Sequence, residues 1–134
     1  MIKKTHKKTS KTLTSNCHLL RFGSCGFKLL DSVRLETEQI NSLKRSLTKK
    51  LKNLSSHSKD YKLWILLKPN KTLTKLSLES RMGKGKGAIY TEAVFLKKGT
   101  IIYEFQNLSP QQLSEVLCFS KKQLSVNLTL IQKK

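Results

Sequence analysis

Apolar residues in the first half of the chain repeat at the spacing of an amphipathic helix. Five of them stand three or four residues apart, which places their side chains in one stripe: Ile40, Leu43, Leu47, Leu51 and Leu54. Glu36 and Glu38 stand near the predicted start, where the positive end of the helix dipole favours acidic side chains. A polar, serine-rich loop is expected at 53–60.

A second helix is marked by its capping residues. Ser109 is the predicted N-cap, Pro110 takes the first helical position, and Gln112 completes a capping box. Leu108 is expected to pack on Leu113 as a hydrophobic staple. The predicted apolar face consists of Leu113, Val116, Leu117 and Leu124.

Short apolar or alternating runs bounded by turn residues predict β-strands. The run KLWILLK is typical of a buried strand, and Pro69-Asn70 marks the turn after it. The tripeptide Lys97-Lys98-Gly99 predicts a hairpin between the two runs that flank it. The predicted extended segments are Lys62–Lys68, Thr72–Arg81, Ala88–Leu96, Thr100–Phe105 and Val126–Leu130.

The order of these elements predicts an α+β fold, a sandwich in which two helices pack on a mixed or antiparallel sheet. A chain of 134 residues, 37% of them hydrophobic, can bury one modest core. We therefore expect a single folded domain at 31–134, preceded by a basic N-terminal arm at 1–30.

The predicted arm carries cations and no acidic residue, since Asp31 is the first carboxylate of the chain. Such a stretch cannot bury enough apolar surface to order itself, so we expect it to be extended and to become ordered on a partner. An import sequence is the alternative, but import sequences are usually rich in Arg and amphipathic. The cations of the arm are Lys3, Lys4, Lys7, Lys8, Lys11, Arg21 and Lys28.

The net charge narrows the choice of partner. The chain has 27 Lys and Arg against 8 Asp and Glu, a net charge of +19. A compact domain with this charge repels itself, and a polyanion offsets the repulsion. Nucleic acid, an anionic membrane surface and an acidic protein are the candidates. The predicted first helix adds cations outside its apolar stripe, among them Lys44 and Arg45, which favour a phosphate-facing surface.

The segment RMGKGKG is the most specific feature of the sequence. Glycine lets the backbone take positive φ angles and approach another molecule, and lysine supplies a mobile charge for phosphate. A P-loop would require GxxxxGK[ST], but Ala88 follows the last glycine, and a dinucleotide fingerprint would open a helix rather than a strand. We interpret the segment as a pliable cationic finger made of Arg81, Met82, Gly83, Lys84, Gly85, Lys86 and Gly87.

Patterns for catalysis or metal binding are not found in the sequence. The three cysteines lack CxxC spacing, the three histidines are scattered, and the eight carboxylates form no obvious pair. The longest apolar run, Leu63–Leu67, is far shorter than the roughly 20 residues of a membrane helix, and no secretory signal is expected. We predict no enzyme activity, cofactor, metal or small-molecule substrate. Trp64 is expected in the core, and Tyr61 and Tyr90 stay open as partners for base stacking.

These residues resemble a known family. RMGKGKG at Arg81–Gly87 is similar to the signature of the large-subunit ribosomal protein sixteen family, of bacterial and organellar type. Further matches follow in the family's order across roughly residues 22–131. Phe22–Lys28 is similar to its FGSxGLK segment, and Arg34-Leu35 and Gln39-Ile40 resemble the entry to its first helix. Lys62–Ile65 and Pro69 resemble its first strand and turn, and Ile102–Glu104 and Ser109–Leu113 resemble its later hairpin and second helix.

The resemblance implies a hammerhead-like α+β fold and a structural role on large-subunit rRNA. It further implies a place near the A-site tRNA and the peptidyl transferase centre, with neighbouring ribosomal proteins as partners and no membrane contact. Arg81, Lys84 and Lys86 would match the rRNA-facing loop, and Arg21 and Lys28 would flank the FGS segment. The drift from the family pattern suggests an organelle-encoded copy, as does a bias toward lysine, asparagine, serine and leucine that fits an AT-rich gene. The mitochondrion is the first choice of organelle and the plastid is the second.

The chain departs from the family pattern before the first helix, where Asp31-Ser32-Val33 replaces a Gly-Arg-Gly-like stretch and removes a cation. One rival hypothesis is a membrane-surface protein that uses the basic amphipathic helix. That helix has no Trp or Phe anchor, and the glycine loop would stay unexplained. A nucleotide-binding enzyme is the other rival, and the pattern of the loop disfavours it.

Overall fold

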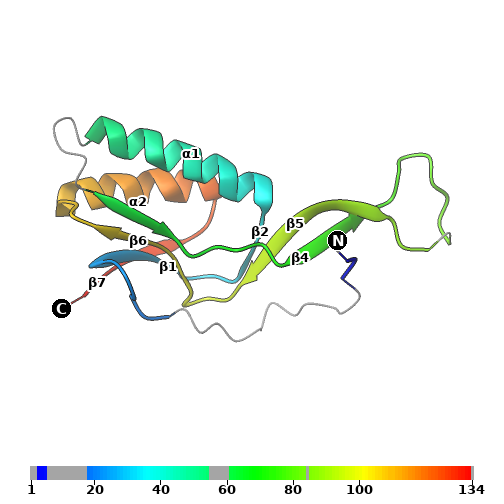
Figure 1. Cartoon of the computed structure of the whole chain (residues 1–134), viewed down its shortest axis with the longest axis horizontal. Coiled ribbons are helices and arrows are strands. Elements are labelled where there is room, and N and C mark those ends of the chain that lie inside the picture. Colours follow the sequence, from blue (N-terminus) through cyan, green and yellow to red (C-terminus); the bar gives the residue numbers. More distant parts are fainter. Residues whose placement is uncertain (1–2, 6–17, 55–60, 84, 134) are drawn as a thin grey trace.

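The computed structural model describes residues 3–5, 18–54, 61–83 and 85–133, and within them the chain forms two helices and seven strands. One sheet has the strand order β3-β6-β1-β7 and the other β2-β5-β4. In Figure 1 the two helices lie beside each other over the four-stranded sheet, and the β4–β5 hairpin reaches away from them. The elements are β1 (Cys25–Leu29), β2 (Val33–Glu36), α1 (Thr37–Leu54), β3 (Lys62–Ile65), β4 (Lys71–Lys75), β5 (Ala88–Leu96), β6 (Ile101–Gln106), α2 (Pro110–Leu124) and β7 (Leu128–Gln132).

The hydrophobic core lies between the helices and the four-stranded sheet. Phe27 of β1 and Phe105 of β6 are fully buried, with ring centroids 4.7 Å apart. The helices contribute buried leucine, isoleucine and valine side chains to the same cluster. Because every strand pair described is antiparallel, the predicted α+β sandwich is confirmed in its antiparallel form, with two sheets in place of one. The buried helix residues of the cluster are Ile40, Leu43, Leu47, Leu51, Leu113 and Val116.

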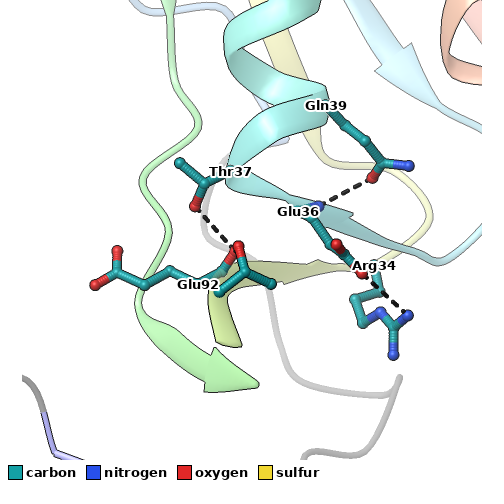
Figure 2. Close-up of polar contacts among 6 residues, drawn as sticks. Arg34, Glu36, Thr37, Gln39 and Glu92 are labelled. Atoms are coloured by element: carbon teal, nitrogen blue, oxygen red, sulfur yellow. Dashed lines mark hydrogen bonds and ion pairs between the residues drawn. The ribbon is translucent and has the colours of Figure 1, made fainter. Parts of the chain in front are cut away.

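The predicted stripe of α1 is confirmed, and the start of the helix is attached to the three-stranded sheet. The Thr37 hydroxyl donates to the backbone oxygen of Glu92 on β5 at 2.9 Å (Figure 2). The Gln39 side chain accepts from the backbone N–H of Glu36 at 3.0 Å, which satisfies a donor that a helix leaves without a partner at its start. Arg34 pairs with the Glu36 carboxylate at 3.4 Å, so three side-chain contacts hold the direction of β2 into α1.

The predicted capping box of α2 is confirmed. Ser109 Oγ accepts from the Gln112 backbone N–H at 3.3 Å, and Gln112 Oε1 accepts from the Ser109 backbone N–H at 3.0 Å. The side-chain nitrogen of Gln112, Nε2, also donates to the backbone oxygen of Leu54 at 3.2 Å. This one side chain therefore caps α2 and joins its start to the end of α1.

The hairpin predicted at Lys97–Gly99 is wrong, because β5 and β6 lie in different sheets. The backbone N–H of Gly99 donates to the oxygen of Leu29 at 2.7 Å, and the Leu29 N–H donates to the oxygen of Thr100 at 2.9 Å. These bonds connect the turn to the end of β1, so the chain crosses from one sheet to the other there. The true hairpin joins β4 and β5, which pair antiparallel.

The strand predicted at Lys62–Lys68 is shorter and less buried than expected. β3 ends at Ile65 and lies at the edge of its sheet, where its side chains are half-buried or exposed. Trp64 is not in the core, since its neighbours Leu63 and Ile65 face the helices and side chains alternate along a strand. Its ring stacks on Phe22 instead, with centroids 6.1 Å apart.

The predicted boundary of the folded domain at residue 31 is too late. β1 lies inside the four-stranded sheet, between β6 and β7, and its Phe27 is fully buried. The segment before β1 is also held, because the carboxylate of Glu104 accepts the backbone N–H groups of Arg21, Phe22 and Gly23. The last part of the predicted arm is therefore a structural part of the domain.

Candidate RNA-binding surface

The β4–β5 hairpin places the glycine loop. Its register runs from Lys71 opposite Ala93 to Lys75 opposite Ala88, and the connection at 76–87 closes its far end. Figure 1 shows this connection as the part of the fold farthest from the helices, at the right of the view. The hairpin therefore carries the loop away from the core, where another molecule can reach it from several sides.

The three glycines of the loop are required for two different reasons. Gly83 and Gly85 have φ angles of +95° and +84°, in a region that side chains disfavour, and an added Cβ would have no heavy atom within 4 Å. At Gly87 an added Cβ would lie 2.3 Å from the backbone oxygen of Lys75, which β4 contributes. The first two glycines set the path of the loop, and the third lets the two strands approach. The prediction of a glycine-dependent loop is thus confirmed in its geometry.

The tip of the hairpin presents charge and apolar surface together. Arg81 is exposed, and Met82 and Leu78 are exposed to 97% and 99%. Tyr90 is exposed as well, with the Lys75 ammonium 5.5 Å from its ring centroid, a cation–π distance. Such a mixture fits folded RNA, which offers phosphates and unstacked bases. Of the loop residues predicted to bind, Lys84 lies outside the described residues.

The two tyrosines left open by the sequence have different environments. Tyr61 is half-buried and packs against the core, so it contributes to stability. Tyr90 is exposed near the tip of the hairpin. Tyr90 is therefore the tyrosine whose ring is exposed for stacking on a base, on the face away from the Lys75 ammonium.

The N-terminal segment Lys3–Thr5 lies against this hairpin. The Thr5 backbone N–H donates to Thr72 Oγ1 on β4 at 2.9 Å, and Lys4 Nζ donates to the backbone oxygen of Lys86 at 3.2 Å. Two of the predicted arm cations, Lys3 and Lys4, thus lie beside the loop. The predicted cations Lys7, Lys8 and Lys11 lie outside the described residues.

The cationic face of α1 is a second, separate surface. Lys44 and Arg45 are exposed, as predicted, and line a shallow depression on the outside of the helix. Lys50 faces α2 instead, where it pairs with Glu115 at 3.2 Å. In Figure 1 α1 lies at the opposite end of the molecule from the glycine loop. The depression is lined by Asn41, Lys44, Arg45, Thr48, Lys49 and Lys52.

The last two predicted site residues flank the FGS segment in different settings. Arg21 is exposed, and its backbone is held by the Glu104 carboxylate at 3.1 Å. Lys28 is half-buried within β1, opposite Ile101 of β6 and Thr129 of β7. Of the predicted residues that the structure describes, Lys3 and Lys4 lie beside the hairpin with the loop, Lys44 and Arg45 lie together on α1, and Arg21 and Lys28 lie at the FGS segment.

Sequence reasoning missed the role of Glu104, which supports one of these places. Its side chain is fully buried, and one oxygen accepts from Phe22 N at 2.6 Å and Gly23 N at 2.7 Å. A buried carboxylate requires such donors, because an ionised group in the interior is costly without them. The signal in the sequence was an acidic residue within the apolar run IIYEF. Its donors lie more than 80 residues away and could not be identified from the pattern.

The described part of the chain has neither a metal-binding cluster nor a membrane-spanning helix. Within residues 3–5, 18–54, 61–83 and 85–133, no three His, Cys, Asp or Glu side chains gather where they could hold a metal ion. In the same ranges neither helix is long and apolar enough to span a membrane.

Comparison with known proteins identifies the family. The family described as ribosomal protein L16p/L10e matches residues 1–131. The large ribosomal subunit protein uL16m of Chondrus crispus is 42% identical over 132 residues, which cover 98% of this chain and 96% of that protein. Protein uL16 of Psychrobacter arcticus and uL16c of Emiliania huxleyi are 31% and 29% identical over 131 residues, 98% of this chain and 91% of each relative.

The fold is that of a small, strongly cationic α+β protein, and its sequence matches ribosomal proteins over nearly all its length. The chain belongs to the ribosomal protein L16p/L10e family. The predicted family is thereby confirmed, as is a structural role in the large ribosomal subunit during translation. The relatives carry the name of a protein of the large ribosomal subunit.

Proposed function

We propose that this protein binds large-subunit rRNA through its glycine loop and N-terminal segment, and helps to organise the A-site tRNA region near the peptidyl transferase centre. The observation that carries the proposal is the position of the loop at the end of the β4–β5 hairpin, with exposed Arg81 and two positive-φ glycines. The cationic face of α1 supplies a second set of phosphate contacts.

The physical basis of this binding is counterion release. Each phosphate neutralised by Lys or Arg frees a condensed cation, so affinity falls steeply as salt rises. With 6–10 phosphate contacts the affinity is expected to fall by roughly 10³–10⁵ between 50 and 200 mM salt. A protein with a net charge of +19 can supply that many contacts.

The proposal is tested by measuring the affinity of the full-length protein for a large-subunit rRNA fragment over a range of salt concentrations. Arg81→Ala and Lys84→Ala are each expected to reduce the slope of log affinity against log salt by about 1. Lys122→Ala removes the same charge from an exposed position on α2 and is expected to leave the slope unchanged. Loop variants that behave like Lys122→Ala would contradict the role of the loop.

We also propose that the protein works in a mitochondrial ribosome, with rRNA and neighbouring ribosomal proteins as partners. The similarity to uL16m of Chondrus crispus supports this location, and the weaker similarity to uL16c of Emiliania huxleyi makes the plastid the alternative. Purified mitochondria provide the test, since the protein is expected to co-sediment with their large ribosomal subunit. Recovery with plastid ribosomes would favour the alternative, and recovery with vesicles in the presence of rRNA would favour a membrane-surface role.

A further inference from the structure

The segment Lys3–Thr5 is held on the outer strand of the three-stranded sheet. Thr72 of β4 makes the contact: its Oγ1 accepts from the Thr5 backbone N–H at 2.9 Å and donates to the Lys3 backbone oxygen at 3.1 Å. The Thr5 hydroxyl in turn accepts from the Thr72 backbone N–H at 3.2 Å and lies 3.1 Å from the Thr72 hydroxyl. Each threonine thus uses both its backbone and its hydroxyl, a pairing that we call the threonine clasp.

A second pair of contacts joins the same segment to the glycine loop. The Lys86 ammonium donates to the Thr5 backbone oxygen, and the Lys4 ammonium donates to the Lys86 backbone oxygen at 3.2 Å. The side chain of Lys86 therefore points at the N-terminal segment. Because its ammonium group donates to a backbone oxygen of the protein, Lys86 holds the N-terminal segment rather than contacting phosphate directly.

We infer that the N-terminal segment and the glycine loop form one composite surface for the phosphodiester backbone of RNA, in which Thr72 is a positioning residue and Lys86 holds the segment in place. This inference rests on the proposed RNA-binding function and extends it. The Lys4 and Lys86 ammonium groups each donate to a backbone oxygen across the contact between segment and loop, and the exposed side chain of Lys3 is presented beside β4 before RNA arrives. Lys86 contributes to binding through the segment that it holds.

The benefit of this arrangement is a smaller loss of entropy on binding. Ordering a flexible basic segment costs conformational entropy, which reduces the affinity gained from its charges. A segment already held by the clasp has lost part of that freedom in the free protein. Thr72 and Lys86 both act on the ordering of the N-terminal segment, so their effects on RNA affinity cannot be independent.

The first measurement concerns the free protein and needs no RNA. Hydrogen exchange at the Thr5 amide reports the clasp, because this N–H donates to Thr72. Thr72→Val keeps the branched shape of the side chain and removes its hydroxyl, so exchange at Thr5 is expected to accelerate. Thr74→Val makes the same change two residues further along β4 and is expected to leave the Thr5 amide unchanged. Equal exchange in the wild type and Thr72→Val would overturn the inference.

The second measurement is a double-mutant cycle on the affinity of the full-length protein for a large-subunit rRNA fragment. Thr72→Val and Lys86→Ala are each expected to weaken binding about 3- to 10-fold, the net effect of a few hydrogen bonds, and Thr74→Val to leave it unchanged. The double variant Thr72→Val/Lys86→Ala is expected to bind about as well as the weaker single variant. If the two losses multiply instead, Lys86 acts on RNA independently of the clasp and the inference is wrong. A wild type that binds no rRNA is a different outcome, since it refutes the proposed function itself.

Discussion

The core of the protein and the tip of its hairpin use glycine for opposite purposes. In the core region, a Cβ at Gly23 would lie 2.5 Å from the backbone oxygen of Phe105, and one at Gly26 would lie 2.6 Å from the Leu20 side chain. At the tip, a Cβ at Gly83 or Gly85 would meet nothing within 4 Å, but both residues have positive φ. Glycine is therefore required in the core for space and at the tip for backbone conformation.

This difference separates the two regions in their response to substitution. In the core region a side chain must displace the backbone of β6, so the free energy of unfolding falls. At the tip a side chain alters the path of an exposed loop and leaves the hydrophobic cluster untouched. We therefore expect changes in the core region to appear as loss of stability, and changes at the tip to appear as loss of binding.

The largest loss of stability is expected for Glu104→Ala. This change removes the acceptor of the Arg21, Phe22 and Gly23 N–H groups, of which the Gly23 bond is buried and the other two are part-buried. We expect the free energy of unfolding to fall by about 3–5 kcal/mol, as measured by chemical denaturation. Glu115→Ala, which removes an exposed carboxylate paired with Lys50, is expected to cost about 0.5 kcal/mol and serves as the control. Similar losses for the two variants would contradict this role of Glu104.

A smaller loss is expected for Gly23→Ala. The new methyl group would lie 2.5 Å from the oxygen and 2.9 Å from the nitrogen of Phe105, both backbone atoms that cannot rotate away. Denaturant titration is expected to show a loss of about 2–3 kcal/mol. A variant as stable as the wild type would show that the segment before β1 can shift without cost, and the comparison between the two regions would fail.

Gly85→Ala is expected to weaken RNA binding and to leave the stability of the domain nearly unchanged, the reverse of Gly23→Ala. The methyl group meets no neighbour, so the cost is the positive φ angle alone, about 1 kcal/mol within the loop. The unfolding transition of the domain is expected to stay close to that of the wild type, while affinity for the rRNA fragment falls several-fold. Gly85→Asn is the matched variant, because Asn tolerates positive φ better than Ala does. If Asn weakens binding as much as Ala, bulk rather than conformation is the limiting property.

The smallest effect is expected for Tyr103→Phe. The Tyr103 hydroxyl is buried, and no partner for it is found among the described residues. Removing an unsatisfied polar group is expected to leave the unfolding free energy unchanged or to raise it by up to about 1 kcal/mol. A loss of more than about 1 kcal/mol would show that the hydroxyl has a partner that stabilises the fold.

The same residue predicts a dependence on alkaline pH. Burial raises the pKa of Tyr103 above its usual value, so the folded state keeps the proton after the unfolded state has lost it. Stability is therefore complete below about pH 10 and falls as pH rises further. Tyr103→Phe is expected to flatten this decline in a series of denaturant titrations. An equal decline in both proteins would assign it to other groups.

Local signals in the sequence were sufficient for the helices and for the loop. The capping residues of α2 act within four positions of one another, and the stripe of α1 follows from helix geometry alone. The segment RMGKGKG predicted an exposed cationic loop, and the structure places the residues of this segment that it describes in such a loop. Each of these features depends on neighbours along the chain, so the pattern of residues contained the necessary information.

Long-range features could not be predicted in this way. The two runs beside Lys97–Gly99 look like hairpin strands, yet each found a better partner elsewhere: β5 pairs with β2 and β4, and β6 pairs with β1 and β3. Trp64 looks like a core residue within KLWILLK, but an edge strand turns it toward Phe22. Strand pairing depends on which surfaces the whole fold brings together, and the sequence of one strand does not specify its neighbour.

The sequence by itself therefore determined the fold class, both helices, the cationic character and the glycine loop of this ribosomal protein. The tertiary structure alone decided that Glu104 holds the segment before β1 and that Thr72 holds the N-terminal segment beside Lys86. The physical reason is range. Helix periodicity, capping and composition act over a few residues, whereas these hydrogen bonds join groups 67 to 83 positions apart, and only the packed fold brings such groups within bonding distance.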